Sequence, residues 1–186
     1  QAAAREIDYG RYYALVIGNN DYSNLPNLKT AVNDATVVAD VLRQNYGFTV
    51  ELLLNANRYK IVTALNNLRK NLTYGDNLLI YYAGHGMLEE VTDIGYWLPV
   101  DAENDNNANW ISNSAVTGLI GTIPSLHVLV VADSCYSGTL SRGVKVEQRI
   151  GVEQDEWLVR MAQKKSRTLM SSGGVEPVQD SGGSGH

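Results

Sequence analysis

The chain contains a single cysteine among its 186 residues. One cysteine cannot form a disulfide within the chain, which excludes a small fold held together by disulfide bridges and leaves the compartment open. No apolar run reaches the 18 residues of a membrane-spanning helix. The residues after Gln1 lack the apolar core of a signal peptide. We therefore expect a soluble protein, with the cytoplasm slightly favoured, and the missing initial Met suggests a piece of a longer chain.

Other features are also scarce. Lys and Arg number 15 against 20 Asp and Glu, and this net charge of −5 argues against binding to nucleic acid phosphates. Three His and one Cys are too few for a zinc site of the usual kind. The chain has no G-x-G-x-x-G or Walker-type loop, so a nucleotide-binding domain built on Gly18-Asn-Asn20 is disfavoured. A serine hydrolase is disfavoured because no G-x-S-x-G elbow is present.

What the chain does contain is an alternation of short apolar runs and amphipathic stretches. Its 44% hydrophobic and 19% charged residues are typical of a globular domain. The runs predicted as strands are 12–18, 48–54, 78–83, 126–132 and 167–171, with 95–100 as a short strand or extended loop. Helical spacing is present at 28–45, around 61–68, at 111–120 and around 156–163, whereas 88–93 and 101–109 are polar and predicted as loops. This alternation predicts an α/β fold, a three-layer α/β/α sandwich with a mostly parallel central sheet.

Two of the predicted strands end in residues that can perform chemistry. The run before Asp133 leads into Cys135, and the run 78–83 leads into His85. Because the carboxyl ends of parallel strands meet at one edge of a sheet, neighbouring strands would bring the thiol and the imidazole together. The imidazole would then take the thiol proton, and the amides of Gly86 and Cys135 would bind the developing oxyanion. Taken alone, either residue is more often structural, since a lone cysteine usually behaves as a small apolar side chain.

The residues around these two groups carry a family resemblance. Tyr82-Ala-Gly-His-Gly86 and Asp133-Ser-Cys-Tyr-Ser-Gly138 resemble the two active-site motifs of caspase-like cysteine peptidases, closest to bacterial caspase homologues and metacaspases. Animal caspases carry Gln-Ala-Cys where this chain has Asp-Ser-Cys. The motifs are about 50 residues apart, as is known for caspases, and the resemblance extends from residue 12 to 174. It implies peptide-bond hydrolysis with His85 as acid/base and Cys135 as nucleophile.

The resemblance also implies a substrate class. Metacaspases cleave after Arg or Lys, and they place acidic residues in the binding pocket at the positions of Asp34 and Asp133. Two carboxylates facing one guanidinium form a strong charge-assisted arrangement. The chain departs from the family at Ala83, where metacaspases often have Ser, which would weaken the pocket by one hydrogen bond. The alternatives are that Asp34 serves only as a charge at a helix N-terminus and that Asp133 only caps a turn.

The resemblance further implies how the domain is divided. We expect one domain over 1–186, with a large-subunit-like part at 1–140, a linker at 141–165 and the beginning of a small-subunit-like part at 166–186. A peptidase specific for basic residues could cut its own linker and so be made as a zymogen; a plain charged loop is the alternative. The Gly-rich end resembles the point where bacterial homologues continue, which implies further domains. The predicted cleavage sites are Arg142, Lys145 and Arg149.

Calcium is a separate question that the resemblance raises, because many metacaspases bind it through acidic residues after a Pro-Val-Asp segment. That segment is present at residues 99–101, but the stretch expected to hold the acidic pair reads Ile111-Ser-Asn-Ser114. The remaining oxygen donors nearby are Asp93, Asp101, Glu103 and Asp105. We expect the chemistry to need no cofactor and the chain to hold no metal, with Ca²⁺ as the less favoured alternative.

The expected partners are therefore protein or peptide substrates with Arg or Lys at the cleaved bond, without nucleic acid or membrane. A competing hypothesis is a caspase-like interaction module without activity. We disfavour it because His85 and Cys135 are both present, whereas inactive relatives commonly lack one of the two.

Overall fold

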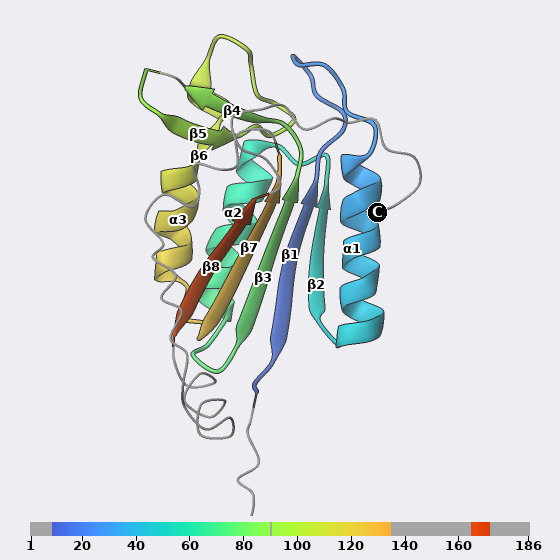
Figure 1. Ribbon diagram of the computed structural model, residues 1–186, viewed down its shortest axis with the longest axis vertical. Helices are drawn as coiled ribbons and strands as arrows, with labels where there is room; N and C mark the ends of the chain where they lie inside the picture. The colour runs from blue at the N-terminus through green and yellow to red at the C-terminus, as the bar shows by residue number, and fades with distance from the viewer. Residues whose placement is uncertain (1–8, 90, 135–164, 172–186) are drawn as a thin grey trace, which may run out of the picture.

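The computed structural model describes residues 9–89, 91–134 and 165–171 of the chain. A five-stranded parallel sheet in the order β2-β1-β3-β7-β8 forms its centre, and a three-stranded antiparallel sheet, β4-β5-β6, lies at one end (Figure 1). The predicted three-layer α/β architecture is confirmed. The elements are β1 (Tyr12–Gly18), α1 (Ala31–Tyr46), β2 (Thr49–Leu54), α2 (Arg58–Asn71), β3 (Asn77–Ala83), β4 (Gly86–Glu89), β5 (Ile94–Trp97), the 3-10 turn η1 (Asn107–Asn109), β6 (Ile111–Ser112), α3 (Asn113–Thr122), β7 (His127–Asp133) and β8 (Ser166–Ser171).

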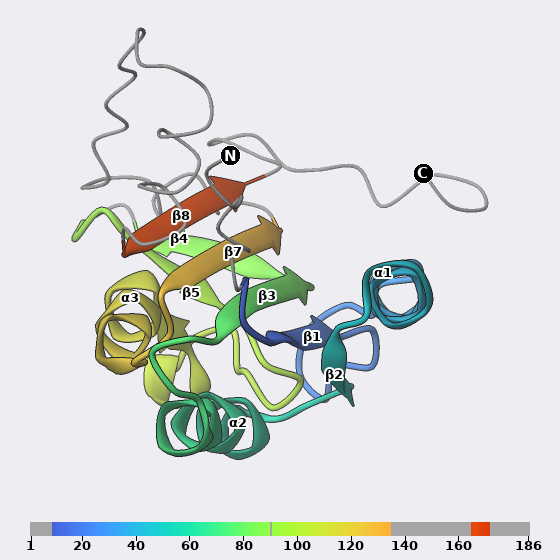
Figure 2. The same cartoon turned by 90° about the horizontal axis from the view of Figure 1, so that it is seen from below.

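The central strands are apolar on both faces because helices cover both. On one face, Leu15, Ile80 and Val130 pack with side chains of α2 and α3 in the larger core cluster. On the other face, Val16 and Tyr81 pack against the small side chains of α1. Figure 2 shows α2 and α3 on one side of the sheet and α1 on the other. Strands buried in this way need continuous apolar runs, which is why the sequence pattern identified them.

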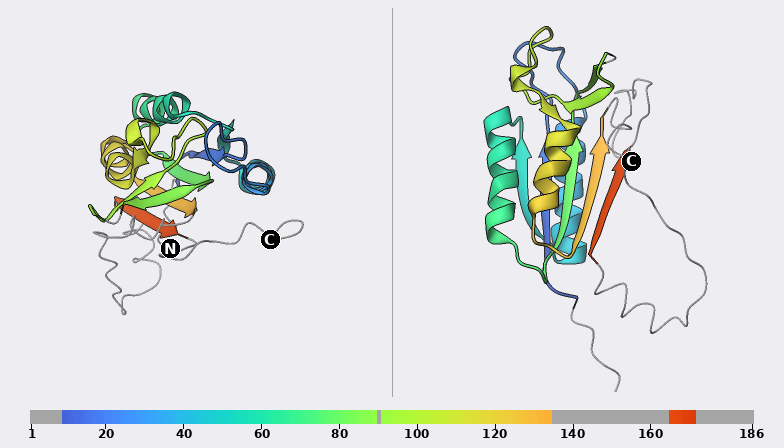
Figure 3. Two further views of the ribbon diagram at one scale, coloured as in Figure 1. Left: turned by 90° about the horizontal axis from the view of Figure 1, so that it is seen from above. Right: turned by 90° about the vertical axis from the view of Figure 1, so that its left-hand side faces the viewer.

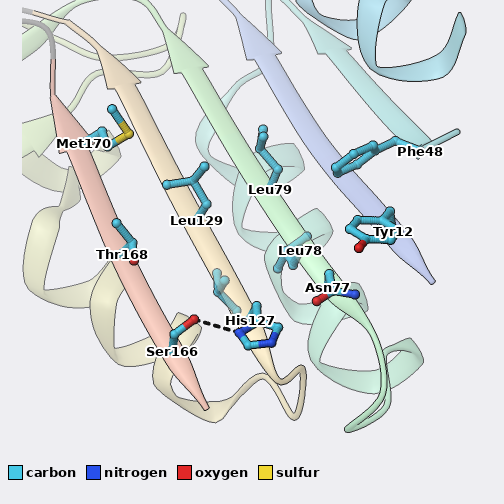
Figure 4. A pocket seen from close by; sticks show the side chains of 11 residues that line it. Tyr12, Phe48, Asn77, Leu78, Leu79, His127, Leu129, Ser166, Thr168 and Met170 are labelled. Atoms are coloured by element: carbon cyan, nitrogen blue, oxygen red, sulfur yellow. Dashed lines mark hydrogen bonds between the residues drawn. The ribbon is translucent and has the colours of Figure 1, made fainter. Parts of the chain in front are cut away.

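In the described part of the chain, the face that α1 covers carries a groove further along the sheet. Beyond β1, strands β3, β7 and β8 line a groove of about 460 Å³ with Leu79, Leu129 and Met170 among its apolar side chains (Figure 4). At its polar end, Nδ1 of His127 lies 2.9 Å from Oγ of Ser166. Both residues begin their strands, so this groove extends toward the amino ends of the sheet and away from the edge that carries His85.

A buried carboxylate fixes the beginning of β3 beside the beginning of β1. Asp76 is 1% exposed, and its two oxygens accept hydrogen bonds from Nε and Nη2 of Arg11 at 2.8 and 3.1 Å. The same carboxylate accepts the backbone N–H of Thr73 at 2.6 Å and its hydroxyl at 2.9 Å. Burial raises the pKa of Asp76, but the hydrogen bonds from Thr73 and Arg11 lower it by more, so the carboxyl stays ionised.

The last strand is fixed to the rest of the sheet by a guanidinium. Arg167, on β8, donates to the carbonyl oxygens of Ile123 and Ser125 at 2.9 and 2.8 Å, and to that of Leu126 at 3.2 Å. These carbonyls belong to the connection between α3 and β7. Burial lowers the pKa of the Arg167 guanidinium.

Three sequence predictions about elements differ from the structure. The helix predicted at 111–120 is α3, which begins at Asn113 because Ile111 and Ser112 pair with β5 as β6. The first helix begins at Ala31 rather than at residue 28, because Leu28 N–H donates to the carbonyl oxygen of Asn20 at 3.0 Å and so belongs to the preceding loop. Residues 88–93 were predicted as a polar loop, but Leu88 and Glu89 belong to β4, which pairs with β5. The helix predicted around 156–163 lies outside the described residues. None of the described helices is long and apolar enough to cross a membrane.

Candidate active site

The strands that precede His85 and Cys135 are neighbours in the central sheet. β3 and β7 pair in parallel, and their register ends with Ala83 opposite Asp133. His85 follows that last pair by two residues on one strand, and Cys135 follows it by two on the other. The predicted adjacency of the two strands is therefore confirmed, while Cys135 itself lies outside the described residues. The small sheet β4-β5-β6 lies over this end of the central strands (Figure 3).

The imidazole of His85 has a defined orientation. Its Nε2 lies 2.8 Å from the carbonyl oxygen of Pro26, and its ring packs against that of Tyr22 with 4.6 Å between centroids. A carbonyl oxygen can only accept a hydrogen bond, so Nε2 must carry the proton of the neutral ring. The lone pair is then on Nδ1, which is the nitrogen that can take a proton from a nucleophile.

The backbone of His85 is held on both sides. Its N–H donates to the hydroxyl of Tyr22 at 2.7 Å. Its carbonyl oxygen accepts the N–H of Leu98 at 3.0 Å and lies 2.8 Å from the hydroxyl of Tyr82, which is shared with the carbonyl oxygen of Leu98 at 2.9 Å. Tyr82 is fully buried and stacks on Trp97 with 4.5 Å between centroids. Burial raises the pKa of Tyr22 to about 12, so its hydroxyl stays protonated.

Gly84, directly before His85, has no room for a side chain. A Cβ at this position would lie 2.8 Å from the hydroxyl oxygens of both Tyr22 and Tyr82. These are the two hydroxyls that contact the His85 backbone. The close approach explains why the motif has glycine here, since any larger residue would displace the groups that orient the histidine.

The backbone amide of Gly86, directly after His85, is one of the two predicted oxyanion donors. The hydrogen bond from Leu98 N–H to the His85 carbonyl makes Gly86 and Trp97 a non-hydrogen-bonded pair of the β4–β5 ladder. The Gly86 N–H therefore points away from β5. This orientation is compatible with the predicted oxyanion role, which stays a prediction.

The two predicted pocket carboxylates come from a helix and from a strand of the central sheet. Asp34 is in the first turn of α1, and Asp133 ends β7; both are half-buried. Tyr81, on the intervening strand β3, has its hydroxyl 3.5 Å from Oδ2 of Asp133. Burial, followed by the negative charges of Asp133 and Asp34, raises the pKa of the Tyr81 phenol. The position of Asp34 also suits its alternative role as a charge at a helix N-terminus.

Asparagine side chains, which the sequence analysis did not assign to the site, shape the loop that carries Pro26. Oδ1 of Asn55 accepts the backbone N–H groups of Asn20 and Asp21 at 2.8 and 3.1 Å. Oδ1 of Asn20 accepts the N–H of Val32 at 3.1 Å, in the first turn of α1, and Oδ1 of Asn27 accepts that of Tyr22 at 2.9 Å. The high frequency of Asn after β1 was the feature of the sequence that could have indicated this role, because Asn side chains readily form hydrogen bonds with nearby backbone groups.

Two of the carboxylates named as oxygen donors for the alternative of a calcium site accept hydrogen bonds from other residues of the protein. Oδ1 of Asp101 accepts the N–H of Arg58 at 2.9 Å, and Oε2 of Glu103 accepts Nδ2 of Asn106 at 3.1 Å. In the described part of the chain, no three His, Cys, Asp or Glu side chains gather in a way that could hold a metal ion. The predicted cleavage sites in the linker lie outside the described residues.

Comparisons with known proteins agree with this geometry. A family described as caspase domain matches residues 11–177. The human mucosa-associated lymphoid tissue lymphoma translocation protein 1 is 37% identical over 91 residues, which cover 49% of this chain and 11% of that protein. Metacaspase-6 of Arabidopsis thaliana is 27% identical, with 68% of this chain and 38% of that protein covered. Metacaspase-1A of Aspergillus niger is 23% identical, with 88% and 46% covered.

Among solved structures, a protein of Geobacter sulfurreducens superposes with a TM-score of 0.57 and 25% identity, covering 71% of this chain and 53% of that one. The chain spans less than half of the length of the three relatives named above.

Proposed function

The chain belongs to the caspase domain family of cysteine peptidases, and from this premise we propose that it is an endopeptidase that cleaves after Arg or Lys. The observation that carries the proposal is the pairing of β3 with β7. It brings the residues before His85 and before Cys135 to the same edge of the sheet. The orientation of the His85 ring, with the lone pair on Nδ1, supports its role as the base.

In the proposed reaction, Nδ1 of His85 takes the proton of the Cys135 thiol. The thiolate then attacks the carbonyl carbon of the substrate, and the oxyanion that forms accepts hydrogen bonds from the amides of Gly86 and Cys135. The carbon–nitrogen bond breaks as the imidazolium returns its proton to the leaving amine. Water, deprotonated by the same imidazole, then hydrolyses the thioester, releasing the carboxylate product and regenerating the thiol.

The preference for basic residues is proposed from Asp34 and Asp133, which we call the acidic pair. Both carboxylates act electrostatically on the phenol of Tyr81, so they share one neighbourhood although one is on α1 and the other on β7. A guanidinium or ammonium placed there would be stabilised by two negative charges, whereas an Asp side chain of a substrate would be repelled. The same specificity would allow self-cleavage at Arg142, Lys145 or Arg149.

An interaction module without catalytic activity is the alternative, and both functions can be tested together. Fluorogenic peptides ending in Arg, Lys or Asp are incubated with wild type and with Cys135→Ala, each with and without Ca²⁺. We expect cleavage after Arg or Lys by wild type and none by the variant. Cleavage after Asp alone would exclude the role of the acidic pair. No cleavage under any of these conditions would favour the interaction module.

The acidic pair is tested in the same assay with Asp34→Asn and Asp133→Asn, which keep the shape of each side chain and remove its charge. We expect each variant to lower kcat/KM for Arg peptides by about tenfold to a hundredfold, the range for losing a hydrogen bond to a charged group. Asp40→Asn is the matched control, because Asp40 is an exposed residue of α1 whose ion-pair partner in the structure is Arg43.

A further inference from the structure

Tyr81 contributes a hydroxyl group to an otherwise apolar face of the sheet. Its side chain, 9% exposed, packs in the cluster between the sheet and α1, where its neighbours include Ala31, Ala35, Ala83 and Val131. These side chains are hydrocarbon. The polar end of Tyr81 is therefore the feature of this cluster that could form a directed hydrogen bond with a ligand.

The hydroxyl of Tyr81 is a neighbour of Asp133 and lies within the electrostatic reach of Asp34. It is 3.5 Å from Oδ2 of Asp133, at the long limit for a hydrogen bond. Asp34 is close enough to act on the same phenol electrostatically. Two carboxylates from different elements thus act on one phenol, and β3 carries that phenol two residues before the end of the strand.

The protonation state of this group is settled by its surroundings. Burial and the two negative charges both disfavour a phenolate, and they raise the pKa of Tyr81 above its ordinary value. A protonated phenol can donate one hydrogen bond and accept others at the same oxygen. At neutral pH the Tyr81 hydroxyl can therefore donate to Asp133 while its lone pairs accept an N–H group.

An arginine side chain has more N–H donors than a lysine side chain, so it can use a further acceptor beside the acidic pair. A guanidinium carries five N–H groups in fixed directions, and it reaches further than the ammonium of lysine, which is a compact charge. A third acceptor beside Asp133 would accept an N–H of such a planar group in a further direction. Ala83, opposite Asp133 in the register, has no side-chain oxygen to take that place.

We propose that the Tyr81 hydroxyl is a specificity-determining group of the acidic pocket, where it accepts an N–H of a substrate guanidinium and favours Arg over Lys. This inference rests on the proposed function, because it concerns the same binding pocket. Tyr81 contacts the substrate side chain and takes no part in the proton transfers of His85 and Cys135.

The test compares wild type with Tyr81→Phe on two fluorogenic peptides that differ only in Arg or Lys at the cleaved bond. We expect kcat/KM for the Arg peptide to fall about tenfold to a hundredfold, as when a hydrogen bond to a charged group is lost. The loss should be mainly in KM, because the contact is made before the transition state as well as in it. The Lys peptide should lose less, so the ratio of Arg to Lys cleavage falls.

The ratio of Arg to Lys cleavage, rather than either rate alone, decides whether Tyr81 has the proposed role. A smaller folded fraction would lower both rates by the same factor, whereas an altered pocket changes their ratio. Tyr12→Phe is the matched control, because it removes a phenol hydroxyl at the beginning of β1, where Tyr12 lines the groove of Figure 4 away from the edge that carries His85. It should leave the ratio unchanged.

Two results would overturn the inference, and they differ in what else they overturn. An unchanged ratio in Tyr81→Phe, with Arg cleavage lost in Asp34→Asn and Asp133→Asn, removes the role of Tyr81 and leaves the proposed function in place. Cleavage by wild type after Asp, and not after Arg or Lys, overturns both together.

Discussion

Nε2 of His85 and the carbonyl oxygen of Pro26 are 2.8 Å apart, although 59 positions separate the two residues in the chain. This contact ties the candidate base to the loop between β1 and α1. It selects the tautomer with the proton on Nε2, which leaves the lone pair of the neutral ring on Nδ1. The loop therefore orients the imidazole with a backbone oxygen rather than with a side chain.

The first prediction concerns the shape of that loop. Asn27→Ala removes the acceptor of the Tyr22 N–H, a bond of 2.9 Å in the segment that contains Pro26. Losing one such bond costs about 0.5–1.5 kcal/mol, so we expect kcat to fall by up to about tenfold with little change in KM. Steady-state kinetics with an Arg peptide measures both.

Asn24→Ala is the control for this variant. Asn24 lies in the same loop, but its Nδ2 makes only a long bond of 3.4 Å to the carbonyl oxygen of Ala102. We expect kcat close to that of wild type. Equal losses in the two variants would show that the loop tolerates neither change and that Asn27 has no particular role in positioning Pro26.

The second prediction concerns Gly84. In Gly84→Ala the new methyl group meets the hydroxyls of Tyr22 and Tyr82 at 2.8 Å. Tyr82 is fully buried and cannot move aside, so we expect a stability loss of about 1–3 kcal/mol, as for overpacking of a core. Activity should fall further than the folded fraction, because both hydroxyls contact the backbone of His85.

Gly118→Ala provides a matched control in differential scanning calorimetry. Gly118 is in α3, and a Cβ there would have no heavy atom within 4 Å. We expect it to raise stability by up to about 1 kcal/mol, the difference in helix propensity between Ala and Gly. A Gly84→Ala protein with unchanged melting temperature and activity would contradict the tight packing inferred at this position.

The parts of the site that could be predicted from sequence are those encoded by local patterns. Continuous apolar runs identified β1, β3 and β7 because strands buried on both faces require them. His85 was recognisable because it follows such a run between two glycines. The boundaries were less accurate where a distant residue sets them, as when the carbonyl of Asn20 holds Leu28 in the loop before α1.

What could not be predicted depends on contacts between residues far apart in the chain. Tyr22 accepts the His85 N–H across 63 positions, and a tyrosine within a polar loop has no local feature that indicates this. Pro26 acts through its carbonyl oxygen, which every residue possesses. Tyr81 and Tyr82 are adjacent in sequence, and only the orientation of β3 decides which of them faces α1 and which faces His85.

The third prediction is a pH dependence of stability that comes from Asp76. Hydrogen bonds from Thr73 and Arg11 keep the pKa of this carboxyl below its ordinary value of 3.8. A carboxyl with a lowered folded-state pKa stabilises the fold fully above its unfolded-state pKa, and this contribution disappears as pH falls through the folded-state pKa. Urea unfolding between about pH 7 and about pH 2 should show that the free energy of unfolding falls at acid pH, and that it falls less in Asp76→Asn.

At neutral pH, Asp76→Asn should cost about 1.5–3 kcal/mol, the range for hydrogen bonds to a charged group. Asp40→Asn is the control, since Asp40 is exposed and its 3.3 Å ion pair with Arg43 lies on the surface. Such pairs contribute about 0–1 kcal/mol. An equal loss of stability at acid pH in wild type and Asp76→Asn would assign the pH dependence to other carboxyls.

The fourth prediction concerns Arg167, whose guanidinium connects β8 with the turn between α3 and β7. Arg167→Met keeps an apolar side chain of similar length and removes the hydrogen bonds to the carbonyl oxygens of Ile123 and Ser125. Because these carbonyls lose charged donors, we expect a stability loss of about 1.5–3 kcal/mol.

Hydrogen exchange should accelerate in β8 more than in β2, since the lost contacts hold only β8. Arg69→Met, at an exposed position of α2, should change stability by less than about 0.5 kcal/mol. Equal exchange rates for β8 in the two variants would mean that its pairing with β7 holds the strand without the guanidinium.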